Sequence, residues 1–135
     1  MNGISDPDAF LRQLFRVAVD AADPMLSVPR NLPPKPGGRV VILGAGKASA
    51  RMAEALETVW GPCEGLVITR YGYARPCEGV EIVEAAHPVP DEAGLLATRR
   101  ILDLAATLRE GDHAVALISG GASARSRIRN RSPRP

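Results

Sequence analysis

Short apolar runs alternate along this chain with longer stretches in which apolar residues recur at helical spacing. The apolar runs predict strands at residues 39–43, 66–69, 80–83 and 114–118. The helical spacing predicts helices over Asp8–Ala22, Ser49–Trp60 and Glu92–Leu108, of which the first is amphipathic. Proline and glycine clusters separate these segments, and they predict loops at Pro29–Gly38, Tyr71–Pro76 and His87–Asp91.

Strands that alternate with helices favour an α/β fold, with a mostly parallel sheet and helices on both of its faces. The run at 39–43 is apolar throughout, which is typical of a strand covered on both faces. Val80–Val83 alternates apolar and polar positions, which predicts a half-exposed strand near a sheet edge. In folds of this class, ligands bind where the carboxyl ends of the strands open into a crevice.

The last eleven residues break this pattern. Residues 125–135 hold five of the chain's seventeen basic residues, so the formal net charge of +2 depends on them. The glycine-rich turn at 119–123 is expected to lead into a helix that packs on the sheet, and no helical pattern follows it. We therefore predict a truncated domain over residues 1–124 and a disordered basic tail over 125–135 that arose by frameshift or premature stop. A natural basic tail is the alternative.

Composition excludes several classes of protein. With 135 residues, 45% of them hydrophobic, the chain has the size of one globular domain. No run approaches the roughly 18 apolar residues of a membrane span, and the amino terminus lacks a signal peptide, which predicts a cytoplasmic protein. Cys63 and Cys77 form neither a close metal-ligand pair nor a disulfide framework. Because the basic charge lies in the tail, we expect no nucleic-acid partner and no membrane partner.

The segment Gly44–Ser49 is a glycine-rich turn between a predicted strand and a predicted helix. Backbone N–H groups at such a turn, together with the helix dipole, favour phosphate or carboxylate. Lys47 lies at the helix start, where a cation is unfavourable unless an anion lies beside it. We interpret Gly44, Gly46, Lys47 and Ser49 as an anion clamp, and a solvated lysine beside a tight turn is the alternative.

Two standard nucleotide motifs fit this turn poorly. The Walker pattern needs four residues between its first glycine and Gly-Lys-Ser/Thr, whereas a single residue separates Gly44 from Gly46. The dinucleotide fingerprint has a third glycine where Ser49 stands. The next predicted strand is followed by Arg70, where NAD enzymes usually place an acid. NAD binding is therefore weakly supported, although Arg70 leaves NADP open.

Two further segments are candidates for ligand binding. A second glycine-rich turn, formed by Ser119, Gly120, Gly121 and Ser123, follows the last predicted strand. It is either a second anion cradle or a flexible connection to a missing helix. In the proline-rich loop, His87 and Asp91 are restricted by the prolines between them. Their alternatives are a structural histidine and an aspartate that only caps the following helix.

Three sequence motifs, taken in their order along the chain, resemble those of the bacterial glycerate 2-kinase family, whose members are often labelled hydroxypyruvate reductase. They are Val-Ile-Leu-Gly-Ala-Gly-Lys-Ala-Ser, Ala-His-Pro-Val-Pro-Asp and Leu-Ile-Ser-Gly-Gly-Ala-Ser-Ala. The resemblance covers about residues 6 to 124, and three ordered motifs are far more specific than one glycine pattern. It implies the N-terminal, Rossmann-like domain of a kinase that transfers phosphate from ATP, with Mg²⁺, to the 2-hydroxyl of D-glycerate.

The resemblance also implies roles for individual residues. Lys47 matches the family's motif lysine and is the implied catalytic residue. The implied substrate- or phosphate-binding residues are Gly44, Gly46, Ser49, His87, Asp91, Ser119, Gly120, Gly121 and Ser123, and no metal ligand is implied. Ala122 stands where the family usually has a third glycine, and its methyl group could crowd a bound oxyanion.

Other catalytic groups of this family lie in sequence outside this chain, so we expect no kinase activity from the chain alone. The small-molecule partners implied are glycerate and a nucleotide, and the oligomeric state is left open. Two alternatives remain at this stage. One is an NAD(P)H-dependent hydroxypyruvate reductase, and the other is a free-standing sugar-phosphate-binding module.

Overall fold

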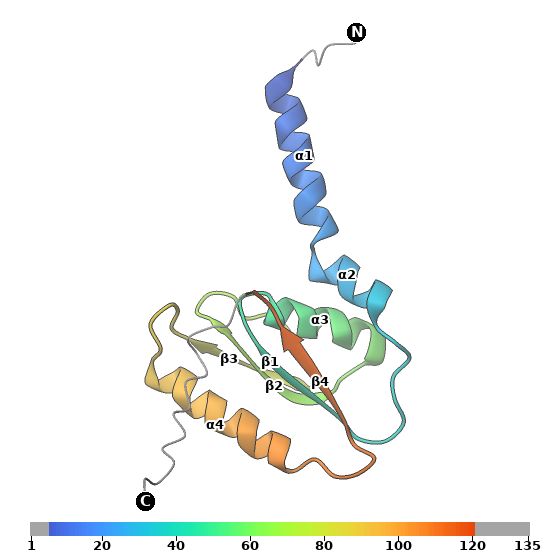
Figure 1. Ribbon diagram of the computed structural model, residues 1–135, viewed down its shortest axis with the longest axis vertical. Helices are drawn as coiled ribbons and strands as arrows, with labels where there is room; N and C mark the ends of the chain where they lie inside the picture. Colours follow the sequence, from blue (N-terminus) through green and yellow to red (C-terminus); the bar gives the residue numbers. More distant parts are fainter. Residues whose placement is uncertain (1–5, 121–135) are drawn as a thin grey trace, which may run out of the picture.

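The computed structural model describes residues 6–120 of the chain. Its elements, in chain order, are α1 (Pro7–Ala21), α2 (Pro24–Asn31), β1 (Val40–Ala45), α3 (Ser49–Trp60), β2 (Glu64–Arg70), β3 (Val80–Ala85), α4 (Glu92–Ala106) and β4 (His113–Ile118). The four strands pair in the order β3-β2-β1-β4, and every pairing is parallel (Figure 1). The predicted α/β fold with a mostly parallel sheet is confirmed.

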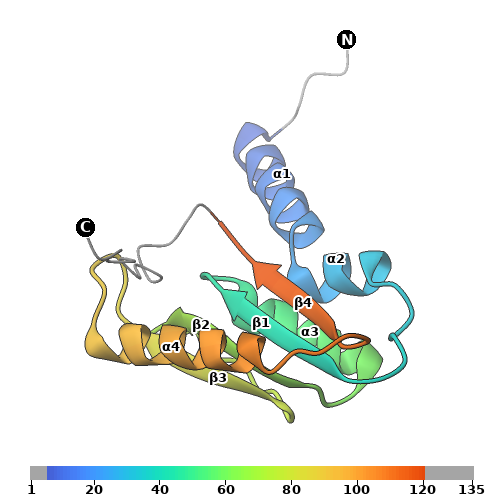
Figure 2. The same ribbon diagram turned by 60° about the horizontal axis from the view of Figure 1, so that its bottom comes forward.

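Helices cover both faces of this sheet, with α4 on one face and α3, next to α2, on the other (Figure 2). The α3 side is packed by Val40, Ile42, Ala53, Leu56, Trp60, Val67 and Leu117, and the α4 side by Leu66, Ile68, Ala85 and Ala97. Successive residues of β2 therefore face opposite helices, as the two-residue period of a strand requires. This double burial explains why β1 and β2 are apolar along most of their length.

The two edges of the sheet differ in the polarity of their exposed residues. β3 forms one edge, as its alternating pattern predicted, and Glu81 on this strand is exposed. β4 forms the other edge, and within the described part of the chain it pairs with β1 alone. Ala114 and Ala116 are exposed there, and Ile118 is 64% exposed. Several apolar residues of β4 are therefore not buried by residues 6–120.

The structure corrects one loop prediction. The first three residues of the predicted loop Pro29–Gly38 belong to helix α2, so that Pro29 lies inside a helix. Asp23 caps this helix, because its carboxylate accepts a hydrogen bond at 2.9 Å from a first-turn N–H. Pro24 occupies the first helical position, where its missing N–H is not needed. Val28 and Leu32 pack against the core on the α3 side, which stabilises α2 despite its internal proline.

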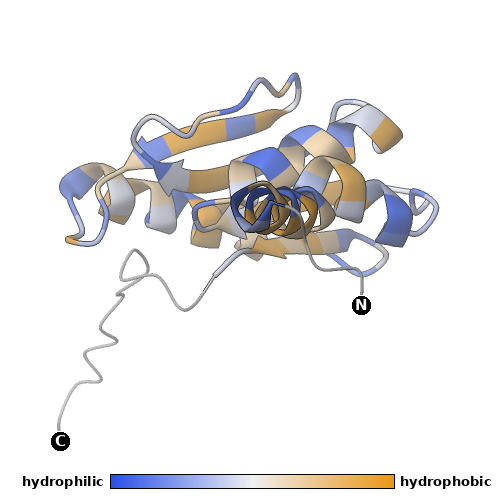
Figure 3. Cartoon of the chain, turned by 90° about the horizontal axis from the view of Figure 1, so that it is seen from above, coloured by the Kyte–Doolittle hydropathy of each residue, from blue (hydrophilic) through white to orange (hydrophobic). Residues whose placement is uncertain are grey.

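Helix α1 confirms the predicted N-terminal helix but stands apart from the sheet (Figure 1). Asp6 caps it by accepting a hydrogen bond from the Ala9 N–H at 3.0 Å. None of its residues is buried, and the exposed apolar side chains are Phe10, Leu11, Leu14, Phe15, Val17 and Val19. Figure 3 shows apolar and polar residues around this helix, which it views nearly end-on. No helix within residues 6–120 is both long and apolar enough to cross a membrane.

Candidate anion-binding site at the carboxyl edge of the sheet

The order in which successive strands join the sheet reverses between β1 and β4. From β1 the chain passes through α3 and β2 outward to β3, and it then returns through α4 to β4 on the other side of β1. The point where strand order reverses is the usual ligand-binding position of an open α/β sheet. Both predicted glycine turns lie there, because Gly44–Ser49 spans the end of β1 and Ser119 follows β4.

Hydrogen bonds join these two turns directly. The Ser119 hydroxyl accepts from the Ala48 N–H at 2.8 Å, and the Ser119 N–H donates to the Ala45 carbonyl at 3.4 Å. The buried Ser49 hydroxyl donates to the carbonyl of Leu117 at 2.9 Å. Ser49 and Ser119 therefore hold the start of α3 against the end of β4. Both serines are predicted ligand-binding residues, and in this structure their hydroxyls also bond within the protein.

The glycines of the first turn are required by this close approach. Gly46 has a φ of 132°, a left-handed conformation that favours glycine. A Cβ atom at Gly46 would overlap the carbonyl oxygen and the hydroxyl of Ser119. A Cβ atom at Gly44 would lie 2.9 Å from the Leu117 carbonyl oxygen and 2.9 Å from Cγ2 of Val67. The first turn can therefore meet β4 only where it carries no side chain.

The N-terminus of α3 opens at this edge. Its N-cap residue, Ala48, has no side chain that could accept from the first helical turn. Part of the turn is already satisfied, since the Gly46 N–H donates to the Ile68 carbonyl at 3.1 Å and the Ala48 N–H to Ser119. The positive end of the helix dipole is thus left without an acidic cap, which favours an anionic ligand.

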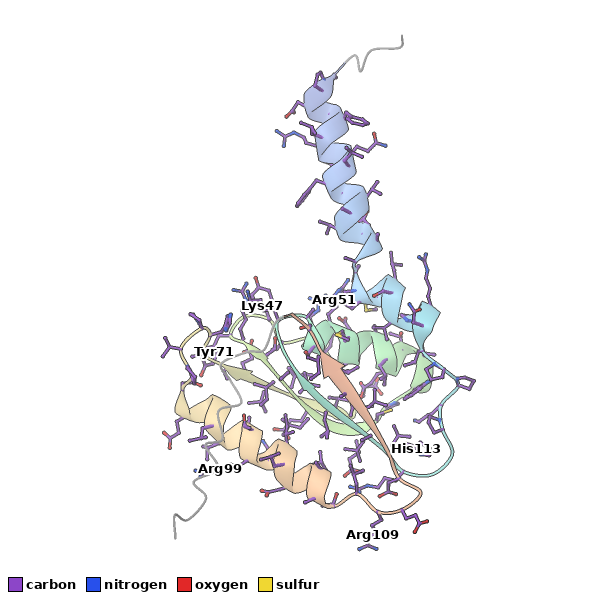
Figure 4. All side chains as sticks on the ribbon, in the orientation of Figure 1. Lys47, Arg51, Tyr71, Arg99, Arg109 and His113 are labelled. Carbon is purple, nitrogen blue, oxygen red and sulfur yellow. The ribbon has the colours of Figure 1, made fainter. Side chains whose placement is uncertain are left out.

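Lys47 directly precedes the N-cap residue of this helix and is exposed. Its ammonium group makes no hydrogen bond and no ion pair with residues 6–120. Its backbone carbonyl accepts a hydrogen bond from the Thr69 hydroxyl at 3.5 Å, which ties the turn to the end of β2. Figure 4 shows Lys47 and Arg51 at this end of the sheet, whereas His113 and Arg109 lie at the opposite end.

A cavity of about 360 Å³ lies beside Lys47. It is lined by Pro24, Lys47, Ala48, Arg51, Gly72, Tyr73, Ala74 and Arg75. The lining therefore combines residues of α2, of the turn between β1 and α3, of α3 itself and of the loop that follows β2. Three of these eight residues carry cationic side chains, which gives the cavity an electrostatic preference for anions.

Two of the three cations are already paired with carboxylates. Arg51 contacts Asp23 at 2.9 Å and Glu54 at 3.3 Å, and Arg75 contacts Glu54 at 2.9 Å. The hydrogen bond from Arg51 lowers the pKa of Asp23, and the same bond raises the pKa of Arg51. Within residues 6–120, Lys47 is the cation of this cavity that has no such partner.

The loop with His87 and Asp91 is farther from Lys47 along the sheet edge. It follows β3, and β2 lies between β3 and β1, so two inter-strand spacings of about 5 Å separate the strand ends. Asp91 caps α4, since its carboxylate accepts from the Gly94 N–H at 3.0 Å, and it also accepts from the Tyr71 hydroxyl at 2.8 Å. These bonds lower the pKa of Asp91, and the bond to Asp91 raises the pKa of Tyr71. His87 is half-buried.

The second turn is described only in its first part. Gly120 has a φ of 73°, which suits glycine, and nothing lies within 4 Å of a Cβ atom placed there. Gly121 and Ser123, which the sequence analysis assigned to ligand binding, lie outside the described residues, as do Ala122 and the predicted tail at 125–135.

Sequence reasoning missed several side chains at this edge. Tyr73 and Arg75 lie in what was predicted only as a loop, and Arg51 was not named. A signal was present, because an aromatic and basic segment directly follows the carboxyl end of a buried strand. Arg70, considered only as a mark of NADP binding, stacks on Tyr73 with 3.6 Å from its guanidinium carbon to the ring centroid.

Comparison with known proteins places this geometry in a family. A family model described as Domain of unknown function (DUF4147) matches residues 10–129. The chain belongs to this family. One relative of this chain by sequence is the D-glycerate 2-kinase of Thermotoga maritima, which is 38% identical over 124 residues, or 87% of this chain and 30% of that protein. An Agrobacterium vitis protein named "Putative hydroxypyruvate reductase" is 50% identical over 115 residues, or 84% of this chain and 26% of that protein.

A solved structure is also similar to this member of the DUF4147 family. The crystal structure of the PH0495 protein from Pyrococcus horikoshii OT3 matches with a TM-score of 0.70 at 27% identity, covering 86% of this chain and 29% of that one. The predicted resemblance to glycerate 2-kinases and hydroxypyruvate reductases is thus confirmed by relatives of both names. The chain spans 26% to 30% of the length of these three proteins.

Proposed function

We propose that this chain is part of a kinase that transfers phosphate from ATP to the 2-hydroxyl of D-glycerate. The observation that carries the proposal is the switch point of the sheet, where the start of α3 has no side-chain cap and lies beside Lys47, which makes no ion pair within residues 6–120. The name of the Thermotoga maritima relative supports the choice of reaction and substrate. The proposal concerns the whole protein, of which this chain supplies one anion-binding wall.

Phosphoryl transfer depends mainly on positioning the reactants and on stabilising negative charge on the phosphate oxygens. The first-turn N–H groups of α3 would donate to phosphate oxygens, and the Lys47 ammonium would neutralise part of their charge. Gly46 allows these groups to lie next to the Ser119 turn without a side chain between them. Hydrogen bonding to the phosphate and charge neutralisation by Lys47 both become stronger when water is excluded. Within residues 6–120 the edge at β4 is exposed, so these residues alone do not exclude water from the site.

Magnesium accompanies ATP in kinases, where it is bound by phosphate oxygens and one or two carboxylates. Within residues 6–120, no three His, Cys, Asp or Glu side chains are grouped so that they could hold a metal ion. We therefore assign no residue of the described part of the chain to Mg²⁺. The contribution proposed for these residues is to bind and orient the phosphate and the substrate.

An NAD(P)H-dependent hydroxypyruvate reductase is the second candidate, favoured by the name of the Agrobacterium vitis relative. A phosphate at the nucleotide ribose would find Arg70 at the end of β2, where dinucleotide folds read that group. Against it, Ser49 replaces the third glycine of the fingerprint, and its hydroxyl is bonded to Leu117. The kinase is therefore the preferred proposal.

A chimera separates the two candidates. The matched region of the Agrobacterium vitis relative is replaced by this chain, and the purified chimera is assayed with ATP and D-glycerate and, separately, with NADPH and hydroxypyruvate. We expect glycerate-dependent ADP release, its loss in Lys47→Met, and no NADPH oxidation. The 135-residue chain alone is expected to release no ADP. NADPH oxidation without ADP release would reject the kinase, and full activity in Lys47→Met would reject the role of Lys47.

A further inference from the structure

The cations near the carboxyl edge of the sheet differ in whether a carboxylate compensates them. Arg51 and Arg75 are paired with Asp23 and Glu54. Arg70, at the end of β2, makes no ion pair with residues 6–120, and its Nε is buried without a hydrogen-bond partner among them. A guanidinium with a shielded, unused donor beside an anion-binding edge is suited to bind an acceptor from a ligand.

Arg70 is held by its aromatic neighbour. The guanidinium carbon lies 3.6 Å from the centroid of the Tyr73 ring, which is a close cation–π contact. Stacking covers one face of the guanidinium and fixes its plane, but it uses none of the five N–H donors. The donors on the edge of the group therefore remain for a ligand, in a fixed orientation.

The loop that carries Tyr73 is itself fixed. The Glu84 carboxylate accepts from the N–H groups of Tyr73 at 3.0 Å and Ala74 at 3.1 Å. Glu84 lies on β3 and pairs in register with Thr69, the residue before Arg70. A side chain positioned in this way loses little freedom when it binds, so its bonds contribute more to affinity.

Arg70 lies close to the Lys47 turn. The Thr69 hydroxyl donates to the Lys47 carbonyl, and the Gly46 N–H donates to the carbonyl of Ile68, so the turn rests on the last residues of β2. Tyr73, on whose ring the Arg70 guanidinium stacks, lines the same cavity as Lys47. Lys47 and Arg70 therefore follow two neighbouring strand ends, and Tyr73 links Arg70 to the cavity that Lys47 lines.

We propose that Arg70 binds the carboxylate of the hydroxy-acid substrate and thereby determines specificity for a carboxylate-bearing alcohol. The planar fork of an arginine matches the two oxygens of a carboxylate, whereas the point charge of Lys47 beside the start of α3 suits a tetrahedral phosphate. The choice of substrate rests on the proposed function, but the binding of a carboxylate by Arg70 is tested independently of any turnover.

The experiment follows the ¹⁵Nε–¹H signals of the arginines in the full 135-residue chain, with the Arg70 signal assigned by its loss in Arg70→Lys. The chain is titrated with D-glycerate, with glycerol, which lacks the carboxylate, and with inorganic phosphate. We expect D-glycerate to shift the Arg70 signal with a saturable curve, glycerol to leave it unchanged, and phosphate to shift it less than D-glycerate does.

Variants test the geometry. Arg70→Lys keeps the charge but loses the fork, and is expected to weaken D-glycerate binding about ten-fold or more. Tyr73→Phe keeps the stacking ring and is expected to change the affinity less than about two-fold, whereas Tyr73→Ala weakens it several-fold. Arg99→Lys, an exposed arginine of α4 labelled in Figure 4, is the matched control and is expected to have no effect.

Three results would overturn the proposal. They are an Arg70 signal that D-glycerate leaves unchanged, one that phosphate shifts more strongly than D-glycerate does, and equal D-glycerate affinity in wild type and Arg70→Lys. Because the chimera tests the kinase by ADP release, failure of the kinase and failure of the carboxylate site give different results.

Discussion

Replacement of Gly46 by alanine tests whether the two glycine turns are sterically coupled. The new methyl group would overlap the carbonyl oxygen and the hydroxyl of Ser119, and the backbone φ of 132° is unfavourable for any residue with a Cβ atom. The φ strain costs about 1–2 kcal/mol. Forcing the β4 turn away costs about 1–3 kcal/mol more, by analogy with overpacked cores. Gly46→Ala is therefore expected to lower the free energy of unfolding by roughly 2–5 kcal/mol, out of a total of about 5–15 kcal/mol.

The assay is urea unfolding followed by the fluorescence of Trp60, the chain's single tryptophan, which is 9% exposed in the α3-side core. Two other glycines separate the contributions. Gly72 has a φ of 79° and open space around the position of an added Cβ atom. Gly72→Ala therefore reports the φ strain alone and is expected to lower the free energy of unfolding by about 1 kcal/mol. Gly37→Ala has neither feature and is expected to be neutral or stabilising by up to about 1 kcal/mol.

The comparison of Gly46→Ala with Gly72→Ala decides whether the contact between the first turn and Ser119 contributes to stability. If both variants lower the free energy of unfolding equally, then the contact between the first turn and Ser119 has no energetic consequence. In that case the glycine at 46 would be explained by its backbone conformation alone, and the coupling of the two turns would be refuted.

Three further predictions concern ionisable groups in other parts of the fold and beside the cavity. The Glu57 carboxylate accepts four backbone N–H groups at 2.6–3.2 Å, and although burial raises its pKa, these bonds lower the pKa overall. The unfolding free energy is therefore expected to fall as the pH drops through the folded-state pKa, and Glu57→Gln, measured by urea titration, should flatten this dependence and cost about 1–3 kcal/mol at pH 7. Burial raises the pKa of the Cys77 thiol to about 11, so iodoacetamide is expected to alkylate it at pH 8 about 100-fold more slowly than in urea, as followed by mass spectrometry. Asp23→Ala removes both the cap of α2 and the partner of Arg51, and is expected to cost about 1–3 kcal/mol in thermal or urea unfolding, whereas exposed Asp20→Ala stays within about 0.5 kcal/mol.

Much of the fold follows from local pattern. Val41 and Ile42 are fully buried in β1, where an apolar run between loops predicted a strand covered on both faces. Helix α2 is not predicted, because Pro29 and the prolines after it indicate a loop. The packing of Val28 and Leu32 against the core favours the helix instead. The exposed face of α1 could not be foreseen, since an amphipathic pattern shows that a face is apolar without showing what covers it.

The site divides in the same way. The meeting of the two glycine turns could be predicted, because parallel strands direct their carboxyl ends to one edge. The pairing of Arg51 with Asp23 could not, since it joins residues 28 positions apart whose contact depends on how α2 packs against α3. Arg70 on Tyr73 likewise depends on the path of a loop fixed by Glu84 on the neighbouring strand.

We propose that Lys47 and the start of α3 form one phosphate site. This site is tested most directly by the dissociation constant of 2-phosphoglycerate, measured by isothermal titration calorimetry for the wild-type chain, Lys47→Met and Arg109→Met. Arg109 is exposed at the opposite end of the sheet (Figure 4). We predict that Lys47→Met weakens binding about ten-fold or more while Arg109→Met leaves it unchanged. Equal affinity in wild type and Lys47→Met would contradict the account.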